Sequence, residues 1–99
     1  MPVNKFSDYI GDVEVSSLWF YHVELPSRHV GVIEEVWTHP DYRNQGRATR
    51  LIKQALYHAT DIGCDCIELT VRQDNKDVQE FYKSLGFEDR LNYSYRKKL

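Results

Sequence analysis

The chain is short of several features that would place it in a special class of protein. Its 99 residues include only two cysteines, Cys64 and Cys66, and their i, i+2 spacing suits neither a disulfide framework nor a zinc knuckle. The longest apolar runs, such as residues 18–21, fall far below the ~20 residues needed to cross a bilayer. The first ten residues lack the cationic start and apolar block of a signal peptide. These absences favour a cytoplasmic protein without membrane contact.

The chain also lacks a strong charge of either sign. Its formal net charge is −2, and its four histidines lie at no ligand spacing, so we expect neither a nucleic-acid partner nor a metal site. Apolar residues make up 41% and aromatic residues 13%, which is enough for a modest core at this length. No repeat or linker divides the sequence, so we expect a single domain over residues 1–99.

The first third of the chain is rich in strand formers. Six apolar residues keep a period of two, while Leu18 and Phe20 add apolar character to the opposite face; the six are Val13, Val15, Trp19, Tyr21, Val23 and Leu25. A turn at residues 26–29 leads to a second strand over residues 30–38, most simply in an antiparallel hairpin. Whether residues 11–12 or 16–17 form an earlier turn stays open.

The second predicted strand breaks its own alternation. Ile33 and Val36 are three positions apart, with Glu34 and Glu35 between them. A β-bulge would return both apolar residues to one face, and bulges are favoured beside functional sites. A plain edge irregularity is the alternative interpretation.

After Pro40 the period changes to that of a helix. Seven apolar residues recur at spacings of three and four, which predicts a helix over residues 45–62 ended by Gly63; they are Ala48, Leu51, Ile52, Ala55, Leu56, Ala59 and Ile62. Residues 64–71 then alternate as a strand. Since a strand–helix–strand order favours a right-handed crossover, we expect this strand to pair in parallel.

The rest of the sequence predicts one more helix and a terminal strand. Asp74 or Asn75 would cap the helix, whose apolar stripe (Val78, Phe81, Tyr82 and Leu85) ends at Gly86. Residues 87–99 are expected to form one strand or a hairpin that carries Tyr93 and Tyr95. The whole is therefore predicted to be an α/β fold (α+β in some schemes) with a mixed sheet.

The start of the long helix breaks a charge rule. Residues 42–60 contain four basic residues, Arg43, Arg47, Arg50 and Lys53, and no acidic one, although helix N-termini favour acidic side chains. A bound anion would compensate, because free N–H groups, the helix dipole and guanidiniums together form a phosphate cradle. A solvated basic face is the alternative. Gly46 stands alone, so neither the Rossmann fingerprint nor a P-loop is present.

Three segments match the motifs of a known family in order and spacing. Residues 43–48, Arg-Asn-Gln-Gly-Arg-Ala, fit the signature [QR]-x-x-G-x-[GA], and residues 33–43 look like a central strand with a Pro-x-Tyr-Arg exit. Residues 75–87 look like N-x-x-A-x-x-F-Y-x-x-x-G-F, with Val78 in place of the usual Ala. Together they resemble the GNAT superfamily of acyl-CoA-dependent N-acyltransferases. The resemblance implies a mostly antiparallel sheet with one splayed parallel strand pair and two helices packed on it.

The resemblance also implies a site for acetyl-CoA, the co-substrate, in the wedge between the two parallel strands. Backbone groups of Val36, Trp37 and Thr38 would bind the pantetheine and the acyl carbonyl, turned toward them by the bulge. The pyrophosphate would be held by the backbone N–H groups of Arg43, Asn44, Gln45, Gly46, Arg47, Ala48 and Thr49, with charge-assisted contacts from Arg43 or Arg47. Asn75 is either a further cofactor contact or a simple helix cap.

The implied reaction transfers an acetyl group to a primary amine by direct attack in a ternary complex. Tyr82 would protonate the departing thiolate, and Glu34 or Glu35 would take the proton from the amine. Adjacent strand residues point to opposite faces, so only one of the two carboxylates would serve. A core aromatic is the alternative for Tyr82, and solvated surface carboxylates are the alternative for the two glutamates.

One departure from the family leaves the acceptor open. Members of the family usually have a strand and two helices ahead of the part matched by residues 3–25, and these helices form much of the acceptor wall. Either the site suits a large or exposed amine, small molecule or peptide, or a second subunit completes it. Trp19, Phe20 and Tyr21 are expected to be exposed and to suit a homodimer face. A non-catalytic CoA-binding or structural module is the alternative function, and a phosphate-binding regulator is a third.

Overall fold

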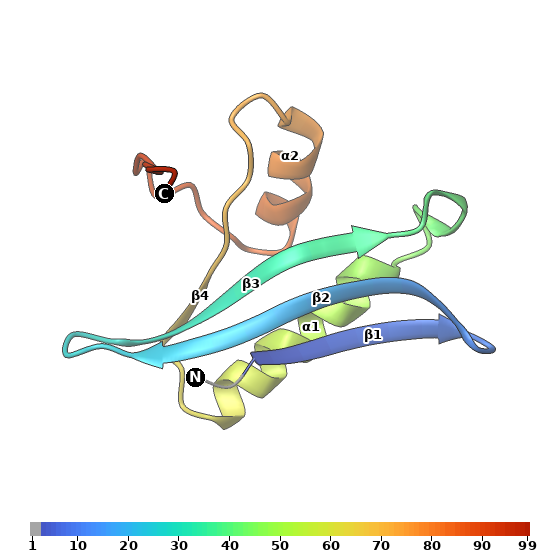
Figure 1. Cartoon of the computed structure of the whole chain (residues 1–99), viewed down its shortest axis with the longest axis horizontal. Helices are drawn as coiled ribbons and strands as arrows, with labels where there is room; N and C mark the ends of the chain where they lie inside the picture. Colours follow the sequence, from blue (N-terminus) through green and yellow to red (C-terminus); the bar gives the residue numbers. More distant parts are fainter. Residues whose placement is uncertain (1–2) are drawn as a thin grey trace.

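The computed structural model describes residues 3–99 and contains one four-stranded sheet and two α-helices (Figure 1). In chain order the elements are β1 (Val3–Ile10), β2 (Val13–Glu24), β3 (His29–Thr38), a 3-10 turn η1 (Pro40–Tyr42), α1 (Arg47–Asp61), β4 (Cys66–Glu68) and α2 (Lys76–Ser84). The sheet order is β1-β2-β3-β4, antiparallel except for the parallel pair of β3 and β4. The predicted mixed sheet is confirmed. The turn before β2 lies at residues 11–12, where Gly11 has a φ of +58°.

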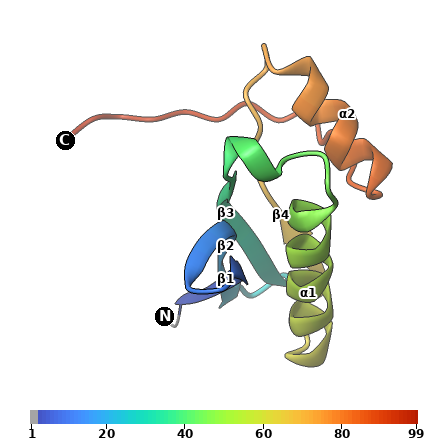
Figure 2. The same ribbon diagram turned by 90° about the vertical axis from the view of Figure 1, so that its right-hand side faces the viewer.

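The core lies between the sheet and α1, which covers one face (Figure 2). The buried side chains that form it are Leu18, Phe20, Ile33, Leu51, Ile52, Ala55, Ala59 and Tyr82. The prediction that Phe20 is exposed is therefore wrong. Both faces of β2 are apolar, and α1 packs against the face that carries Leu18 and Phe20. The opposite face of the sheet carries no helix in the described part of the chain.

A glycine sets how closely β4 approaches the sheet. A Cβ on Gly31 would stand 2.8 Å from the Phe20 ring and 3.0 Å from Ile67 of β4. Since these distances are below van der Waals contact, only glycine lets the Phe20 ring and β4 both close over β3 here. Gly31 is also one of the last residues of β3 to pair with β4.

The bulge predicted in β3 is confirmed. Ser17 pairs with Trp37 and Trp19 pairs with Glu34, so one residue of β2 opposes two residues of β3. Glu35 takes up the extra length with a φ of +56°, an unusual conformation for a non-glycine residue. As a result Ile33 is buried and Val36 packs against the same core.

Two predicted strands differ from the structure. The strand expected over residues 64–71 is paired only at Cys66–Glu68, because β4 diverges from β3 after the pairs Val30–Cys66, Gly31–Ile67 and Val32–Glu68. The strand or hairpin expected over residues 87–99 is wrong: the described structure shows an extended tail without a pairing partner. A period-two pattern supplies strand propensity, but a strand also needs a neighbour for its backbone groups.

Both helices agree closely with the sequence pattern. α1 is followed by Gly63, whose φ of +89° ends the helix as predicted. Asn75 caps α2 by accepting a hydrogen bond from the Val78 N–H at 3.2 Å, and Gly86 with a φ of +93° follows its end. α2 lies beyond β4 and reaches the core through Tyr82 (Figure 1).

Candidate functional site

The divergence of β3 and β4 opens a groove between two strands that are paired at only one end. The groove has a volume of about 270 Å³. One wall comes from β3, a second from the chain that follows β4, and the third from α2; the lining residues are Ile33, Glu34, Glu35, Val36, Leu69, Thr70, Val71, Arg72, Asn75, Val78 and Tyr82. Past Val32, the side of β3 that faces this groove has no strand partner among the described residues. An extended ligand with amide groups would fit such an edge as an added strand does.

The bulge brings both glutamates of β3 to the same groove. The expectation that Glu34 and Glu35 face opposite sides is wrong, because the positive φ of Glu35 interrupts the alternation of the strand. Both side chains are exposed, and neither forms an ion pair with any residue in the described part of the chain. The groove therefore offers two carboxylates for proton transfer or for binding a cation.

Tyr82 combines a buried ring with access to the groove. The side chain is 8% exposed, and its ring lies edge-on to those of Phe81 and Phe87, with centroids 5.1 and 5.6 Å away. Burial raises the pKa of Tyr82 above its ordinary value of 10.0, so the phenol is protonated at neutral pH. Tyr82 is thus a protonated phenol among the residues that line the groove. The interpretation of Tyr82 as a core aromatic is confirmed, and its role as an acid stays a prediction.

Asn75 likewise has two structural roles. Its Oδ1 caps α2, as one of the two interpretations predicted, and the residue also lines the groove. The cap uses the carbonyl oxygen, which leaves the amide NH₂ as the hydrogen-bond donor that a ligand in the groove would meet.

The turn before α1 presents a run of backbone N–H groups. Within residues 3–99 the N–H groups of residues 43–49 have no hydrogen-bond acceptor, and the first intrahelical bond at this end runs from the Arg50 N–H to the Gly46 carbonyl at 3.0 Å. Asn44 and Gly46 have φ values of +61° and +77° on either side of Gln45. Alternation of this kind gathers successive N–H groups into an anion-binding concavity. No heavy atom lies within 4 Å of a Cβ built on Gly46, so the concavity is open.

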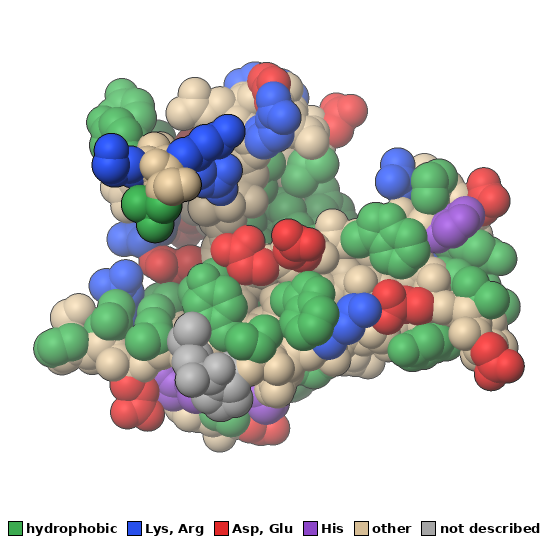
Figure 3. All heavy atoms as spheres, in the orientation of Figure 1, with side chains coloured by type: hydrophobic (Ala, Val, Ile, Leu, Met, Phe, Trp, Pro, Cys, Tyr) green, Lys and Arg blue, Asp and Glu red, His purple; other side chains and the backbone are tan. Residues whose placement is uncertain are grey.

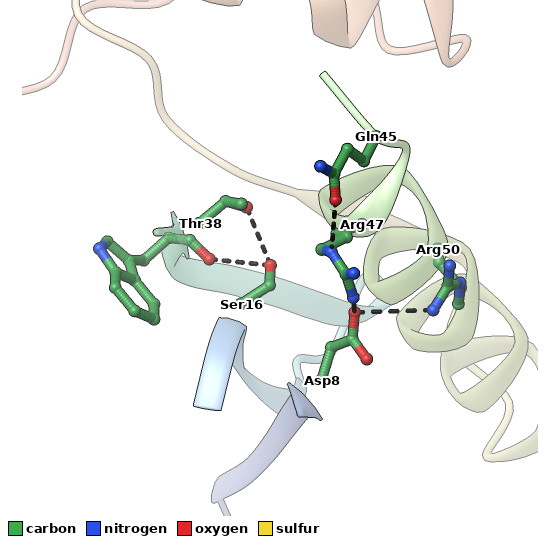
Figure 4. A network of polar contacts seen from close by, with 7 residues as sticks. Asp8, Ser16, Thr38, Gln45, Arg47 and Arg50 are labelled. Atoms are coloured by element: carbon green, nitrogen blue, oxygen red, sulfur yellow. Dashed lines mark hydrogen bonds and ion pairs between the residues drawn. The ribbon is translucent and has the colours of Figure 1, made fainter. Parts of the chain in front are cut away.

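The guanidinium of Arg47 does not face this concavity as a free charge. Its Nη1 donates to Asp8 of β1 at 2.7 Å, its Nε donates to Gln45 at 3.0 Å, and Arg50 lies 3.6 Å from the same carboxylate (Figure 4). Asp8 is thus the internal partner that offsets the basic start of α1. The sequence pattern missed it because the pair joins positions 39 residues apart. Arg43, the other candidate for charge-assisted contacts, donates its Nε–H to the Thr38 carbonyl at 3.1 Å.

The end of β3 is held in place by a serine. The buried Ser16 of β2 donates to the Trp37 carbonyl at 2.9 Å and lies 2.9 Å from the Thr38 hydroxyl (Figure 4). These contacts fix the backbone of the strand between the bulge and the turn that precedes α1. The groove itself is lined by Val36 and not by Trp37 or Thr38.

Other kinds of site find little support. No group of three or more histidine, cysteine or acidic side chains is arranged to hold a metal ion in residues 3–99. Cys64 is half-buried and Cys66 is exposed, and both thiols are free. Burial, with Cys66 and Asp65 nearby, raises the pKa of the Cys64 thiol. None of the described helices has the length and apolar character that a membrane crossing requires.

Comparison with known protein families identifies the fold that carries this groove. The model of the acetyltransferase (GNAT) family matches residues 7–87, which is most of the chain. The chain belongs to the GNAT acetyltransferase family. The groove, the bulged strand and the N–H concavity therefore lie on an acetyltransferase fold.

Similar proteins extend this result. An uncharacterized N-acetyltransferase of Methanocaldococcus jannaschii is 38% identical over 81 residues, which cover 82% of this chain and 35% of that protein. Thialysine N-epsilon-acetyltransferase of Bos taurus is 37% identical over 57 residues, covering 58% of this chain and 34% of that protein. The GNAT chain thus spans about a third of the length of these relatives. The structure of AAC(6')-Iy in complex with a CoA bisubstrate analog superposes with a TM-score of 0.85 at 22% identity, covering 98% of this chain and 69% of the other.

Proposed function

We propose that the chain is an N-acetyltransferase that transfers an acetyl group from acetyl-CoA to a primary amine. The observation that carries the proposal is the splayed pair of β3 and β4, which leaves one strand edge open beside a buried tyrosine and two carboxylates. Membership of the GNAT family supports the reaction class. The domain would extend over residues 1–99.

The residues at both ends of the site fit the two halves of the cofactor. The N–H groups of residues 43–49 have no acceptor in the described chain, and a diphosphate supplies several. The backbone edge at Val36, which lines the groove, suits the amides of a pantetheine arm, whereas the carbonyls of Trp37 and Thr38 already accept from Ser16 and Arg43. Asn75 would add its NH₂ group on the opposite wall. When bound, acetyl-CoA supplies the acetyl group as an activated thioester.

Tyr82 would act as the general acid. As the amine nitrogen bonds to the acetyl carbon and the carbon–sulfur bond breaks, the phenol gives its proton to the leaving sulfur. Its raised pKa keeps that proton in place at neutral pH. Direct attack by the amine in a ternary complex would need no covalent intermediate on a side chain of the groove.

Glu34 or Glu35 would act as the general base. The incoming amine is protonated in solution, since a lysine-type amine has a pKa of ~10.4, and it attacks only after a proton is removed. Both carboxylates line the groove, so either can receive this proton directly or through one water molecule. Glu34 corresponds better to the usual carboxylate of the family and is our first candidate.

The acceptor, the assembly and the location belong to the same proposal. The acceptor would be a small molecule or a peptide with an exposed primary amine, as the names of relatives such as thialysine N-epsilon-acetyltransferase suggest. A second copy of the chain would complete the acceptor side of the groove. The two free cysteines suit the reducing cytoplasm.

A thiol-release assay tests the proposal. The protein is incubated with acetyl-CoA and a panel of amines, and free thiol is followed, while calorimetry measures the affinity for CoA. We expect CoA binding and thiol release with at least one amine. Binding without thiol release for any amine would instead favour a non-catalytic CoA-binding module, and the absence of binding would overturn both.

A further inference from the structure

The turn that precedes α1 is built around the guanidinium group of Arg47. The Nε–H of this group donates to the Gln45 side chain at 3.0 Å, and its central carbon lies over the Tyr42 ring, 5.4 Å from the centroid. These two partners begin and end the stretch 42–45, so one group contacts both ends of it. Between them Asn44 has a φ of +61°, which a non-glycine residue keeps only where its surroundings enforce it. The contacts of Arg47 therefore help to shape the N–H concavity.

Asp8 of β1 fixes the direction of this guanidinium group. Its Oδ2 accepts a hydrogen bond from Nη1 of Arg47 at 2.7 Å, and the two side chains are only 16% and 18% exposed (Figure 4). The register of β1 with β2 shifts between Asp8 and Tyr9, so a bulge lies beside the carboxylate. Bulges often redirect a side chain. The group that holds Arg47 thus comes from the sheet and not from the turn itself.

Asp8 belongs to a row of polar residues that crosses three strands next to the turn. Asp8 pairs with Ser16 of β2, and Ser16 pairs with Thr38 of β3. Ser16 is fully buried, and its hydroxyl lies 2.9 Å from that of Thr38. The Thr38 carbonyl in turn accepts a hydrogen bond from Arg43 at 3.1 Å. The row therefore holds the turn at both ends, through Arg43 at one end and Arg47 at the other.

We infer that Asp8 is a positioning residue of the cofactor site, which holds Arg47 so that the N–H concavity keeps its shape before a ligand binds. The inference rests on the proposed function, because it takes a diphosphate as the ligand of this concavity. A site that is already ordered loses less conformational entropy when the ligand binds. Asp8 also balances the charge of Arg47. The N–H groups of residues 43–49, which have no acceptor within residues 3–99, are then the donors for the anion.

NMR relaxation of the full chain without ligand tests the positioning role directly. In the wild type we expect backbone order parameters of about 0.85 at residues 43–49, as in rigid backbone. Asp8→Asn should lower the order parameters of this turn below about 0.6, the range of flexible segments. Those of α2 should stay unchanged, because Asp8 has no contact with that helix through its ion pairs.

The matched control is Glu14→Gln, which alters an ion pair between the same two strands. Glu14 lies 3.0 Å from Lys5, and the Lys5 ammonium group lies over the Trp19 ring. Trp19 stands between Leu18 and Phe20 in the strand, so this pair lies on the sheet face away from α1. Figure 3 shows acidic and basic side chains side by side among hydrophobic ones on this face. The control should change neither the order of the turn nor the affinity for CoA.

Calorimetry with CoA and with inorganic pyrophosphate tests the consequence for binding. Asp8→Asn should weaken the binding of both about 10-fold, as loss of an outer partner does at metal sites. The kcat at saturating acetyl-CoA should stay unchanged while KM rises, because Asp8 does not line the groove. The double variant Asp8→Asn with Arg47→Gln should bind CoA no more weakly than Arg47→Gln alone, because Asp8 acts through Arg47.

Arg47→Lys is a second variant that tests the same contacts with Asp8 intact. It keeps a positive charge next to Asp8 but loses the Nε–H that bonds Gln45 and the planar group that lies over Tyr42. It should therefore loosen the turn and weaken CoA binding as Asp8→Asn does. This variant decides the question if Asp8→Asn does not fold.

Three results would overturn the inference. They are a flexible turn in the ligand-free wild type, a turn and a CoA affinity that both variants leave unchanged, and tighter CoA binding by Asp8→Asn. The last result would show that Asp8 withholds Arg47 from the anion instead of positioning it. A wild type that binds neither CoA nor pyrophosphate would overturn the proposed function, while relaxation of the ligand-free turn still decides for or against the role of Asp8.

Discussion

The two helices of this chain begin in opposite ways. α2 starts with the side chain of Asn75 bonded to the Val78 N–H, and Asp77 lies in its first turn. α1 starts at Gly46 without a side-chain cap or an acidic residue in its first turn, and the N–H groups of residues 43–49 find no acceptor in the described chain. The positive charge of Arg47 is directed to Asp8 of β1 instead of into this turn.

This difference indicates which groups each helix would contribute to the site. A side chain of the protein satisfies the start of α2, and that helix contributes Tyr82 to the lining of the groove. In the proposed function the start of α1 would bind an external anion, so that helix would contribute backbone N–H groups alone. Four substitutions test this contrast.

The largest effect is expected at the open start of α1. Gly46→Glu would place a carboxylate beside the phosphates, and like charges about 4 Å apart at a protein surface repel by about 4 kcal/mol, or about 1,000-fold in affinity. Calorimetry with CoA measures the loss. Gly46→Ala is the matched control: it shares the strain at a φ of +77° without the charge, so it should retain most of the affinity. Equal CoA affinities of Gly46→Glu and Gly46→Ala would contradict a phosphate site in the N–H concavity.

The second effect concerns the side chain that α2 contributes. Tyr82→Phe should lower kcat by about 100-fold or more, the usual share of a general acid, and should change the CoA affinity less than twofold. Since burial raises the pKa of Tyr82 above 10.0, this acid is not deprotonated between pH 7 and 9, and the phenol should cause no loss of kcat there. Steady-state kinetics between pH 7 and 9 measures the kcat of Tyr82→Phe and the pH dependence of the wild-type kcat, with Tyr57→Phe as control. An unchanged kcat would remove the assignment.

The third effect is on stability at the base of α1. Asp8→Asn removes the charge that pairs with Arg47 and Arg50 in a contact where the Asp8 and Arg47 side chains are only 16% and 18% exposed. The free energy of unfolding should fall by about 1–3 kcal/mol, because a shielded guanidinium loses its partner. Urea unfolding measures it. Asp74→Asn breaks an exposed pair with Arg72 and should cost less than about 1 kcal/mol. Similar losses for both would argue against the special role of Asp8.

The smallest effect is expected at the capped helix. Asn75→Ala should lower the free energy of unfolding by about 1 kcal/mol, the usual value of a side-chain cap, as urea unfolding would show. Asn75→Asp keeps the capping oxygen and should restore the stability. Both substitutions remove the NH₂ group, so a loss of CoA affinity in both variants would mark a contact between Asn75 and the ligand.

Local patterns predicted much of this fold. The helical period, Gly63 and Asn75 indicated α1 and α2, and the three-residue spacing of Ile33 and Val36 indicated the bulge. Patterns of neighbouring residues carry no information on partners distant in the sequence. The pairing of Asp8 with Arg47, the burial of Phe20 on one of two apolar faces, and the unpaired tail over residues 87–99 depend on such partners. The candidate site residues came from a motif, and the meeting of Glu34, Glu35, Val36, Asn75 and Tyr82 in one groove depends on the divergence of β3 and β4.

The bulge at Glu35 also affects how prone the open strand edge is to aggregation. Unpaired backbone groups along a flat strand invite other chains to add on, which is a route to aggregation. A positive φ in the middle of the exposed stretch spoils the regular repeat that an incoming strand would need. The bulge beside which a short extended ligand would bind would therefore also hinder aggregation by strand addition.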